Sequence, residues 1–222
     1  MRLILRNLVP SALIALMAVP VGAATYTNLP GAPDTGPAAG QSVLVDFNGE
    51  LPDGYFLSGD FAYANDTTGA AASPAGDSSR YLYTSSAVGS GVATLSTFDL
   101  SSVSFYWGSI DSYNSVDLLG ADGVTLLSVG GSAFSPANGD QSAAITNQRI
   151  FFTAGAGEVI TGLRFTATGV AFEIDDVAGR LISDGAGAAV PEPATWALMI
   201  GGFGMVGFAA RRRRASISTV AA

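Results

Sequence analysis

The chain has 222 residues, which allows one domain of ordinary size plus short appendages, and its formal net charge is −8. It contains no cysteine and no histidine, and all ten basic residues are arginine, which excludes disulfides, thiolate or imidazole metal ligands, a Ser-His-Asp relay and Schiff-base chemistry. Residues 25–190 hold 17 acidic residues and 4 arginines, and such an acidic body repels phosphate backbones, so nucleic acid is excluded as a partner.

Residues 1–24 have the layout of a secretory signal peptide. Arg2 and Arg6 give a basic start, an apolar run extends over 8–21, and small residues stand at 22–24. Two prolines bracket the apolar run, which is too short to span a membrane as a permanent anchor. The secretion machinery is therefore an expected partner, and the body of the protein is expected to be exported.

The signal peptide offers two cleavage bonds. Cleavage after Ala23 would leave Val21 and Ala23 at the two positions that prefer small side chains. Cleavage after Ala24 would leave Gly22 and Ala24 there. We favour the second bond on the sequence alone.

The exported body begins with residues 25–41, which carry three prolines and three glycines and are predicted to be a disordered lead-in. From 42 to 182, short β-type runs alternate with turn residues, and no helical period appears. The candidate strands are 42–47, 55–63, 80–84, 92–98, 102–107, 115–119, 124–129, 149–153, 159–168 and 170–182. This pattern predicts an all-β domain over 42–182, an antiparallel two-layer jelly-roll-like β-sandwich, with an immunoglobulin-like sandwich as the alternative.

Two local patterns support half-buried antiparallel strands. Val103, Phe105 and Trp107 alternate with polar residues, which predicts that these three side chains share one face. The pair Asp122-Gly123 lies between two candidate strands and predicts a tight hairpin there.

The late candidate strand carries acidic residues in an unusual register. Alternation places Asp176 on the same face as Phe172 and Ile174, which requires a β-bulge or an inward-facing charge with a partner. A calcium ion is a suitable partner for such a carboxylate. Jelly-roll carbohydrate-binding modules, which this arrangement is similar to, often share such an ion between an acid near the first strand and one near the last. That resemblance implies a structural calcium at Asp46, Asp175 and Asp176, and the alternative is that these are ordinary exposed or arginine-paired acids.

Aromatic residues around Trp107 allow a second interpretation. Trp107 and Tyr113 could form a flat platform for a sugar ring, but the alternation of Trp107 with Val103 and Phe105 favours a place in the core. A glycosidase would need two carboxyl groups flanking the scissile bond. Because the body holds 17 acids, chance pairs are expected and identify no catalytic residue.

The chain ends in a tripartite tail. After a flexible linker at 183–190 come Pro191, Glu192 and Pro193, with Trp196 three residues later. An uncharged apolar stretch predicts a single transmembrane helix over 195–210, and the positive-inside rule places the arginine-rich end of that helix in the cytoplasm. The stop-transfer arginines are Arg211, Arg212, Arg213 and Arg214, and 215–222 is the expected cytoplasmic tail.

Motif, spacing, helix and arginine cluster together over 191–214 resemble the PEP-CTERM sorting signal. That resemblance implies recognition by an exosortase, a membrane-embedded cysteine transpeptidase that is thought to cut near the proline-glutamate-proline motif. Such proteins occur in Gram-negative bacteria that make extracellular polysaccharide. The precursor is expected in the inner membrane before processing, and the product at the cell surface, outer membrane or extracellular matrix.

The expected function is therefore that of a non-enzymatic exported surface or matrix protein. The alternatives are a carbohydrate-binding module acting on the extracellular polysaccharide and a carboxylate-based glycoside hydrolase. The loose likeness of the body to other sandwich domains on such tails transfers no activity, because a fold does not determine a function.

Overall fold

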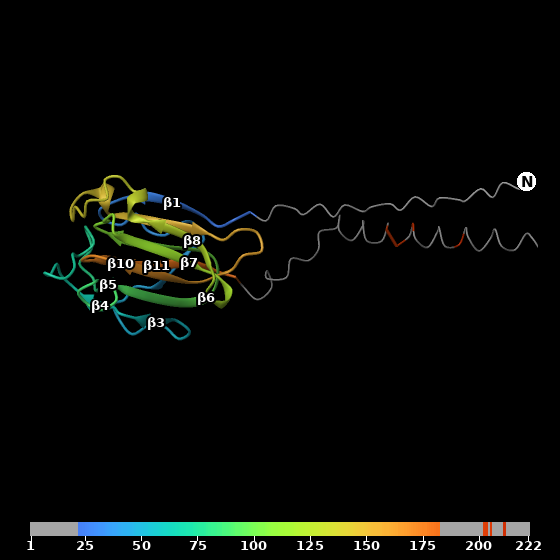
Figure 1. Cartoon of the computed structure of the whole chain (residues 1–222), viewed down its shortest axis with the longest axis horizontal. Coiled ribbons are helices and arrows are strands. Elements are labelled where there is room, and N and C mark those ends of the chain that lie inside the picture. Colours follow the sequence, from blue (N-terminus) through green and yellow to red (C-terminus); the bar gives the residue numbers. More distant parts are fainter. Residues whose placement is uncertain (1–21, 183–201, 204, 206–210, 212–222) are drawn as a thin grey trace, which may run out of the picture. The chain divides into compact units, whose positions relative to one another are not determined.

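A computed structural model describes residues 22–182 together with residues 202, 203, 205 and 211 (Figure 1). Its longest element is β6 (Val92–Gly108), which takes part in both layers of the fold. The first part of β6 pairs with β3 (Phe56–Gly59) and β10 (Ile160–Ala167). The second part pairs with β9 (Gln148–Thr153) and β11 (Phe172–Leu181). The two strands predicted at 92–98 and 102–107 are thus one continuous strand.

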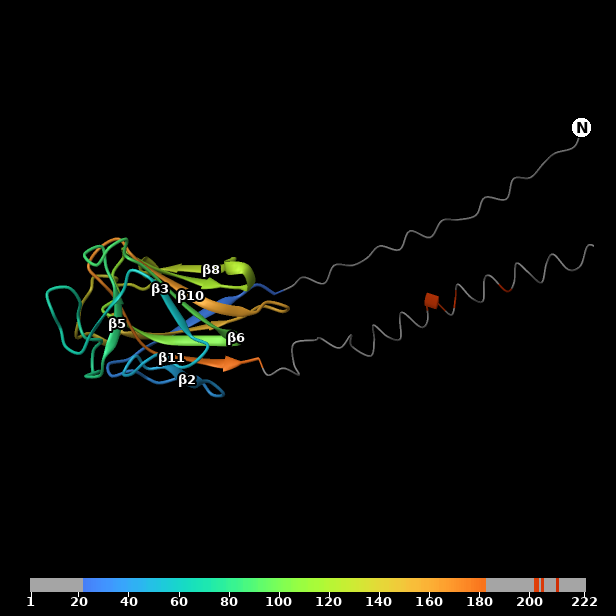
Figure 2. The ribbon, with the colours of Figure 1, turned by 90° about the horizontal axis from the view of Figure 1, so that it is seen from below.

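Every strand pair is antiparallel, and the pairing defines two layers. One layer runs from β3 through the first part of β6 to β10, β7 (Asn114–Leu119) and β8 (Thr125–Gly130). The other layer contains β1 (Thr25–Pro30), β9, the second part of β6 and β11, together with β2 (Ser42–Val45), β5 (Tyr81–Thr84) and β4 (Ala62–Ala64). Figure 2 shows the two layers nearly edge-on, and the prediction of an all-β antiparallel sandwich is confirmed.

The core lies between the layers and is rich in aromatic rings. Phe165 of β10 packs edge-on against Phe105 of β6, with 5.3 Å between ring centroids. Trp107 stacks on Phe172 at 4.2 Å with an interplanar angle of 10°. All four side chains are fully buried, as the alternation in β6 predicts for its own two residues. Each contributes on the order of 2 kcal/mol to the free energy of unfolding through the hydrophobic effect.

The predicted hairpin is present between β7 and β8. Asp122 and Gly123 have φ angles of 57° and 72°, in the left-handed region that this turn chemistry favours. They belong to a short 3-10 turn, η1 (Ala121–Gly123), and two similar turns are η2 (Gly131–Ala133) and η3 (Ala144–Thr146).

The segment 25–41 differs from its predicted disorder. Residues 25–30 form β1, an edge strand on β9, and the residues after it pack on the outer face of β6 and β9. The Tyr106 hydroxyl lies 2.8 Å from the carbonyl oxygen of Gly31, and Ser104 Oγ donates to Gln41 Oε1 at 2.7 Å. Proline and glycine are compatible with an irregular covering segment and with an edge strand. Their abundance in 25–41 therefore did not indicate disorder.

The predicted strand at 55–63 is broken as well. Asp60 interrupts it, so that β3 joins the first layer while β4 joins β5 in the second. Its carboxylate accepts a hydrogen bond from the amide of Ser90, which stabilises the turn between the two short strands.

The described chain enters and leaves the sandwich at one end. Thr25 pairs with Thr153, Thr153 pairs with Ser102, and Ser102 pairs with Arg180, so these four residues form one row across adjacent strands. Figure 1 shows the blue start of β1 and the orange end of β11 at this end, which we call the terminal pole. The end of β6 and the start of β11 meet at the other end, the opposite pole.

Candidate functional site

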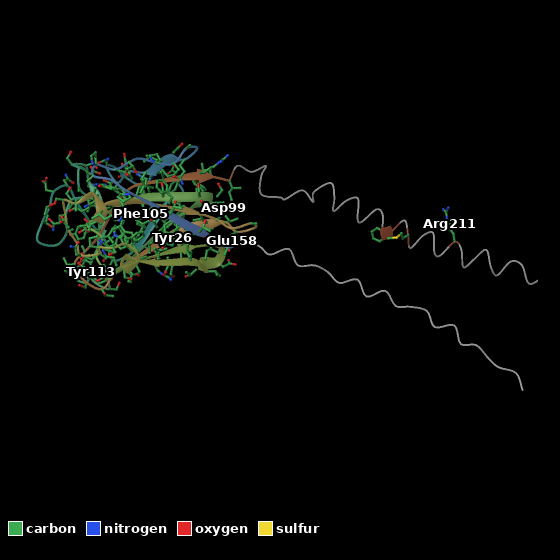
Figure 3. The ribbon with its side chains drawn as sticks, turned by 90° about the horizontal axis from the view of Figure 1, so that it is seen from above. Tyr26, Asp99, Phe105, Tyr113, Glu158 and Arg211 are labelled. Atoms are coloured by element: carbon green, nitrogen blue, oxygen red, sulfur yellow. The ribbon has the colours of Figure 1, made fainter. Side chains whose placement is uncertain are left out.

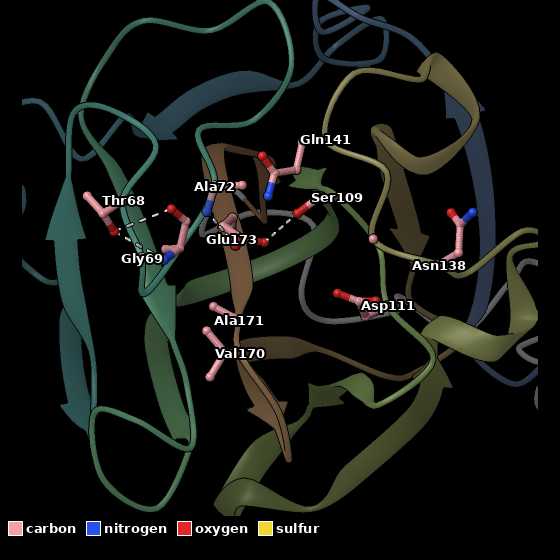
Figure 4. Close-up of a pocket in the computed structure, with 12 residues that line it drawn as sticks. Thr68, Gly69, Ala72, Ser109, Asp111, Asn138, Gln141, Val170, Ala171 and Glu173 are labelled. Atoms are coloured by element: carbon pink, nitrogen blue, oxygen red, sulfur yellow. Dashed lines mark hydrogen bonds between the residues drawn. The ribbon is translucent and has the colours of Figure 1, made fainter.

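A polar pocket lies at the opposite pole, where four loops converge (Figure 4). Its walls come from residues 68–72, 109–111, 138–141 and 170–173. An isolated antiparallel bridge between Asp111 and Asn138 holds two of these loops together. The pocket thus depends on segments far apart in the chain.

Glu173 forms the floor of this pocket and is 2% exposed. Its Oε1 accepts a 2.9 Å hydrogen bond from the amide of Ala72, and its Oε2 accepts one of 2.9 Å from the Ser109 hydroxyl. Burial raises the pKa of Glu173 to about 7, although these hydrogen bonds favour the charged form. The carboxyl group thus links the loop that contains Ala72 to the beginning of β11.

Asp111 and Tyr113 stand at the rim of the pocket. The Tyr113 hydroxyl lies 2.7 Å from Asp111 Oδ2 and also contacts the carbonyl oxygen of Val170. Burial raises the pKa of both groups. The Tyr113 ring lies close to Gly169, where an added Cβ would approach it to 2.7 Å, so the backbone there leaves no room for a side chain beside the ring.

The predicted glycan platform at Trp107 and Tyr113 needs a correction. Trp107 is fully buried against Phe172, so it offers no face to a sugar, and the core interpretation holds for this residue. Tyr113 is half-buried beside the pocket, on a different segment from the tryptophan ring. The structure therefore does not bring the two rings together as one platform.

The predicted calcium ligands are also separated. Asp46 and Asp176 line one surface depression with Asp34 and Asp77, whereas Asp175 is buried beneath Ser79. Within residues 22–182, no group of three or more acidic side chains is placed to hold a metal ion. The structure therefore does not assemble Asp46, Asp175 and Asp176 as one ligand set.

A β-bulge explains the register of Asp176. The pairing of β11 shifts between Asp175 and Ala178, and Asp176 has φ 47°. The extra residue turns Asp176 out of the core and lets Val177 take the inward position, where it is fully buried. Of the two possibilities that the sequence left open, the bulge is the one that occurs.

Asp175 of β11, which is fully buried, and Asp77, which is half-buried in the loop that precedes β5, form a carboxyl pair around the Ser79 hydroxyl. Ser79 Oγ is 2.6 Å from Asp77 Oδ1 and 2.9 Å from Asp175 Oδ2, and its single proton can serve only one of them. Burial, and next the nearby Asp77, raise the pKa of Asp175 to about 8. Burial opposes the ionisation of Asp77, but hydrogen bonds from Ser79 outweigh it and lower that pKa. Sequence reasoning missed this pair because its members lie far apart in the chain.

Arg149 is a second residue that the sequence did not single out. Its guanidinium is fully buried on the outer face of β9, forms an ion pair with Asp34, and donates at 3.0 Å to Ser104 Oγ and to the carbonyl oxygen of Asp176. It thereby joins the segment after β1 to the bulge in β11. These contacts are structural, since every guanidinium nitrogen has a protein partner.

Most residues of the predicted tail lie outside the described part of the chain. This holds for Pro191, Glu192, Pro193, Trp196, Arg212, Arg213 and Arg214, and for most of the predicted helix at 195–210. Residues 202, 203, 205 and 211 are helical, and Arg211 is exposed. Among the residues with described structure, no helix has the length and apolar character needed to cross a membrane. At the other end, Ala23 is exposed and Ala24 is buried.

Comparison with known proteins addresses the tail directly. A family model described as PEP-CTERM protein-sorting motif matches residues 189–214. Neither the curated proteins nor the solved structures yielded a significant match. The matched region contains the proline-glutamate-proline motif, the apolar stretch and the four arginines. The chain therefore carries a PEP-CTERM sorting motif behind its all-β domain, which implies an exported, membrane-anchored precursor that an exosortase processes.

Proposed function

We propose that the protein is a non-enzymatic component of the cell surface or extracellular matrix, which an exosortase cuts near its proline-glutamate-proline motif. The PEP-CTERM motif at 189–214 carries this proposal. It begins soon after β11 ends at Leu181, so the processed segment comes almost directly after the folded domain. Pro191 and Pro193 restrict their own backbones and favour extended geometry before them, which suits recognition by a processing enzyme.

The positions at which the chain enters and leaves the domain support a precursor that is attached to the inner membrane at both ends. Thr25 and Arg180 lie in one row of the sheet, with only β9 and β6 between their strands. Neighbouring strands are about 4.8 Å apart, so a signal peptide and a tail would leave the domain from nearby points. Such a domain can fold while both flanking segments are still in the inner membrane.

The buried carboxyl groups support a non-enzymatic role. A raised pKa is what a general acid in a glycosidase requires. However, both oxygens of Glu173 are already bonded to Ala72 and Ser109, and Asp175 is bonded to Ser79. These acids connect loops to β11 rather than presenting a free carboxyl group to a substrate.

A second candidate function is binding of extracellular polysaccharide at the polar pocket. Asp111, Asn138 and Gln141 line it with side chains that can exchange hydrogen bonds with sugar hydroxyls. The pocket lies at the opposite pole of the domain from Thr25 and Arg180. A glycan array combined with a polysaccharide turnover assay separates the candidates. Binding without turnover supports the module, turnover supports the hydrolase, and neither supports a structural role.

Variants of the tail in a host with an exosortase test the sorting function. We expect Pro191→Ala with Pro193→Ala, or alanine at all of 211–214, to abolish processing and surface display. Asp184→Ala in the linker is the matched control and should be processed normally. Intact mass measurement reads the carboxyl end in each case. Unchanged processing in both tail variants would contradict the proposal.

A further inference from the structure

Ala24 is the residue at which the chain enters the sandwich. It is 7% exposed and belongs to the hydrophobic core, whereas Gly22 and Ala23 before it are exposed. Thr25, directly after it, is the first residue of β1 and pairs with Thr153. The boundary between exposed chain and folded domain therefore falls between Ala23 and Ala24.

We propose that signal peptidase cuts the bond between Ala23 and Ala24, so that the mature protein begins with Ala24. This inference rests on the proposed export of the chain. It reverses the preference for the next bond that the sequence alone suggested. Cleavage after Ala23 places Val21 and Ala23 at the positions that prefer small side chains, so the residue next to this bond, Ala23, fits the recognition rule and Val21 is its larger member.

Cleavage after Ala24 would remove a residue that the folded domain uses. The core would lose the Ala24 side chain, and no solvent-exposed residue would precede the first paired residue of β1. A new ammonium group would then lie on Thr25 itself, within the first residue pair of the sheet. Cleavage one bond earlier removes only exposed residues and leaves β1 and the core complete.

The loop that receives this segment places an acidic side chain, that of Glu158, near the new amino terminus, and its Oε2 accepts a 2.8 Å hydrogen bond from the amide of Gly155. A Cβ added to Gly155 would lie 2.8 Å from the carbonyl carbon of Ala23 and 2.7 Å from Glu158 Oε2. The Glu158 carboxylate and the bond between Ala23 and Ala24 thus lie beside the same Cα atom. Figure 3 shows Glu158 at the terminal pole. Cleavage creates a positive α-ammonium on Ala24, which this acid attracts.

The precursor keeps one contact that cleavage removes. The amide of Ala156 donates a 3.0 Å hydrogen bond to the carbonyl oxygen of Gly22. This donor lies in a loop beside exposed chain, so water can replace the lost carbonyl. The cut therefore leaves no buried polar group of this contact without a partner.

Two substitutions in the full-length chain separate the two bonds. If the wild-type cut comes after Ala23, this residue is the last of the signal peptide, and Ala23→Gln should reduce the product that begins with Ala24 at least tenfold and move the cut to the bond after Ala24. Gly22→Gln should then be cut normally, because it changes a less restricted position and a Cβ on Gly22 meets no atom within 4 Å. If the wild-type cut comes after Ala24, Gly22→Gln should instead reduce the product that begins with Thr25, because Gly22 then occupies a position that needs a small side chain, and Ala23→Gln should leave that product unchanged.

The amino-terminal peptide of the exported wild-type protein gives the direct test by mass spectrometry. A chain that begins with Ala24 supports the inference, and one that begins with Thr25 overturns it while leaving export intact. A chain that retains Met1 overturns both the cleavage site and the proposed export. The carboxyl end, read in the same measurement, tests exosortase processing separately.

Discussion

The Ser109 hydroxyl donates a 2.9 Å hydrogen bond to Oε2 of Glu173, and this contact joins the turn after β6 to the beginning of β11. Ser109 has φ 38°, so the turn holds a strained backbone at the point where the bond forms. The other oxygen of Glu173 accepts from Ala72 and fixes the loop that covers this end of β11. One buried carboxyl group thus organises the floor of the polar pocket.

Removal of this carboxyl group should destabilise the domain. Glu173→Ala leaves the buried Ala72 amide and Ser109 hydroxyl without their acceptor, so we expect the free energy of unfolding to fall by about 2 to 4 kcal/mol. Glu50→Ala, at an exposed acid, should change it by less than about 0.5 kcal/mol. Denaturation by urea measures both variants. Equal stability of the two would show that Glu173 does not anchor the loops.

The stability of the domain should fall as the pH rises from 5 to 8. The folded state raises the pKa of Glu173 from 4.5 to about 7 and that of Asp175 from 3.8 to about 8. Folded protein therefore binds more protons than unfolded protein in this range, and stability present below the unfolded pKa is lost as the pH rises through the folded pKa. The chain has no histidine to obscure the effect. Urea midpoints at pH 5, 6.5 and 8 measure it.

Asp175→Asn should make this pH dependence weaker. The amide resembles the protonated carboxyl group, so the variant should be close to wild type at pH 5 and more stable relative to it at pH 8. Asp46→Asn, at an exposed acid, is the control and should keep the wild-type slope. If Asp175→Asn also keeps that slope, the buried Asp175 carboxyl group beside Asp77 is not the source of the dependence.

The stacked pair in the core should be the most sensitive aromatic contact. Trp107→Ala removes a fully buried ring from Phe172 and should cost about 3 to 5 kcal/mol. Phe56→Ala is a matched control, because that ring is 67% exposed, and it should cost less than about 1 kcal/mol. Thermal unfolding compares the two. A small effect at Trp107 would contradict its place in the core.

Gly155→Ala should distinguish a chain that keeps residues 22 and 23 from one that has lost them. The new Cβ would lie 1.8 Å from the Gly22 carbonyl oxygen, so a chain that begins before Gly22 should lose about 1 to 3 kcal/mol of stability. A chain that begins with Ala24 lacks that oxygen, and of the three atoms nearest to the new Cβ only Oε2 of the movable Glu158 side chain remains. It should stay within about 1 kcal/mol of its parent. Equal losses in both chains would mean that the loop does not contact residues 22 and 23 in solution.

Motifs and local patterns in the sequence were enough to predict that the protein is sorted for export and that its domain is all-β. The sorting motif is read from adjacent residues, so its identity needs no tertiary structure, and the family match at 189–214 confirms it. Alternation in β6 likewise predicted the burial of Phe105 and Trp107, because side-chain direction in a strand depends directly on sequence position.

Tertiary structure alone decided where the polar and terminal residues lie. Glu173 and Asp175 became buried because the loop before β5 folds over the outer face of β11, and nothing in the local sequence specifies which face a distant loop covers. The bulge at Asp176 and the pairing of β1 with β9 depend on partners remote in the sequence. Ala24 has the same small side chain as Ala23, and only its place in the packed core separates the two. Contacts between remote segments create these differences, and a local pattern cannot encode them.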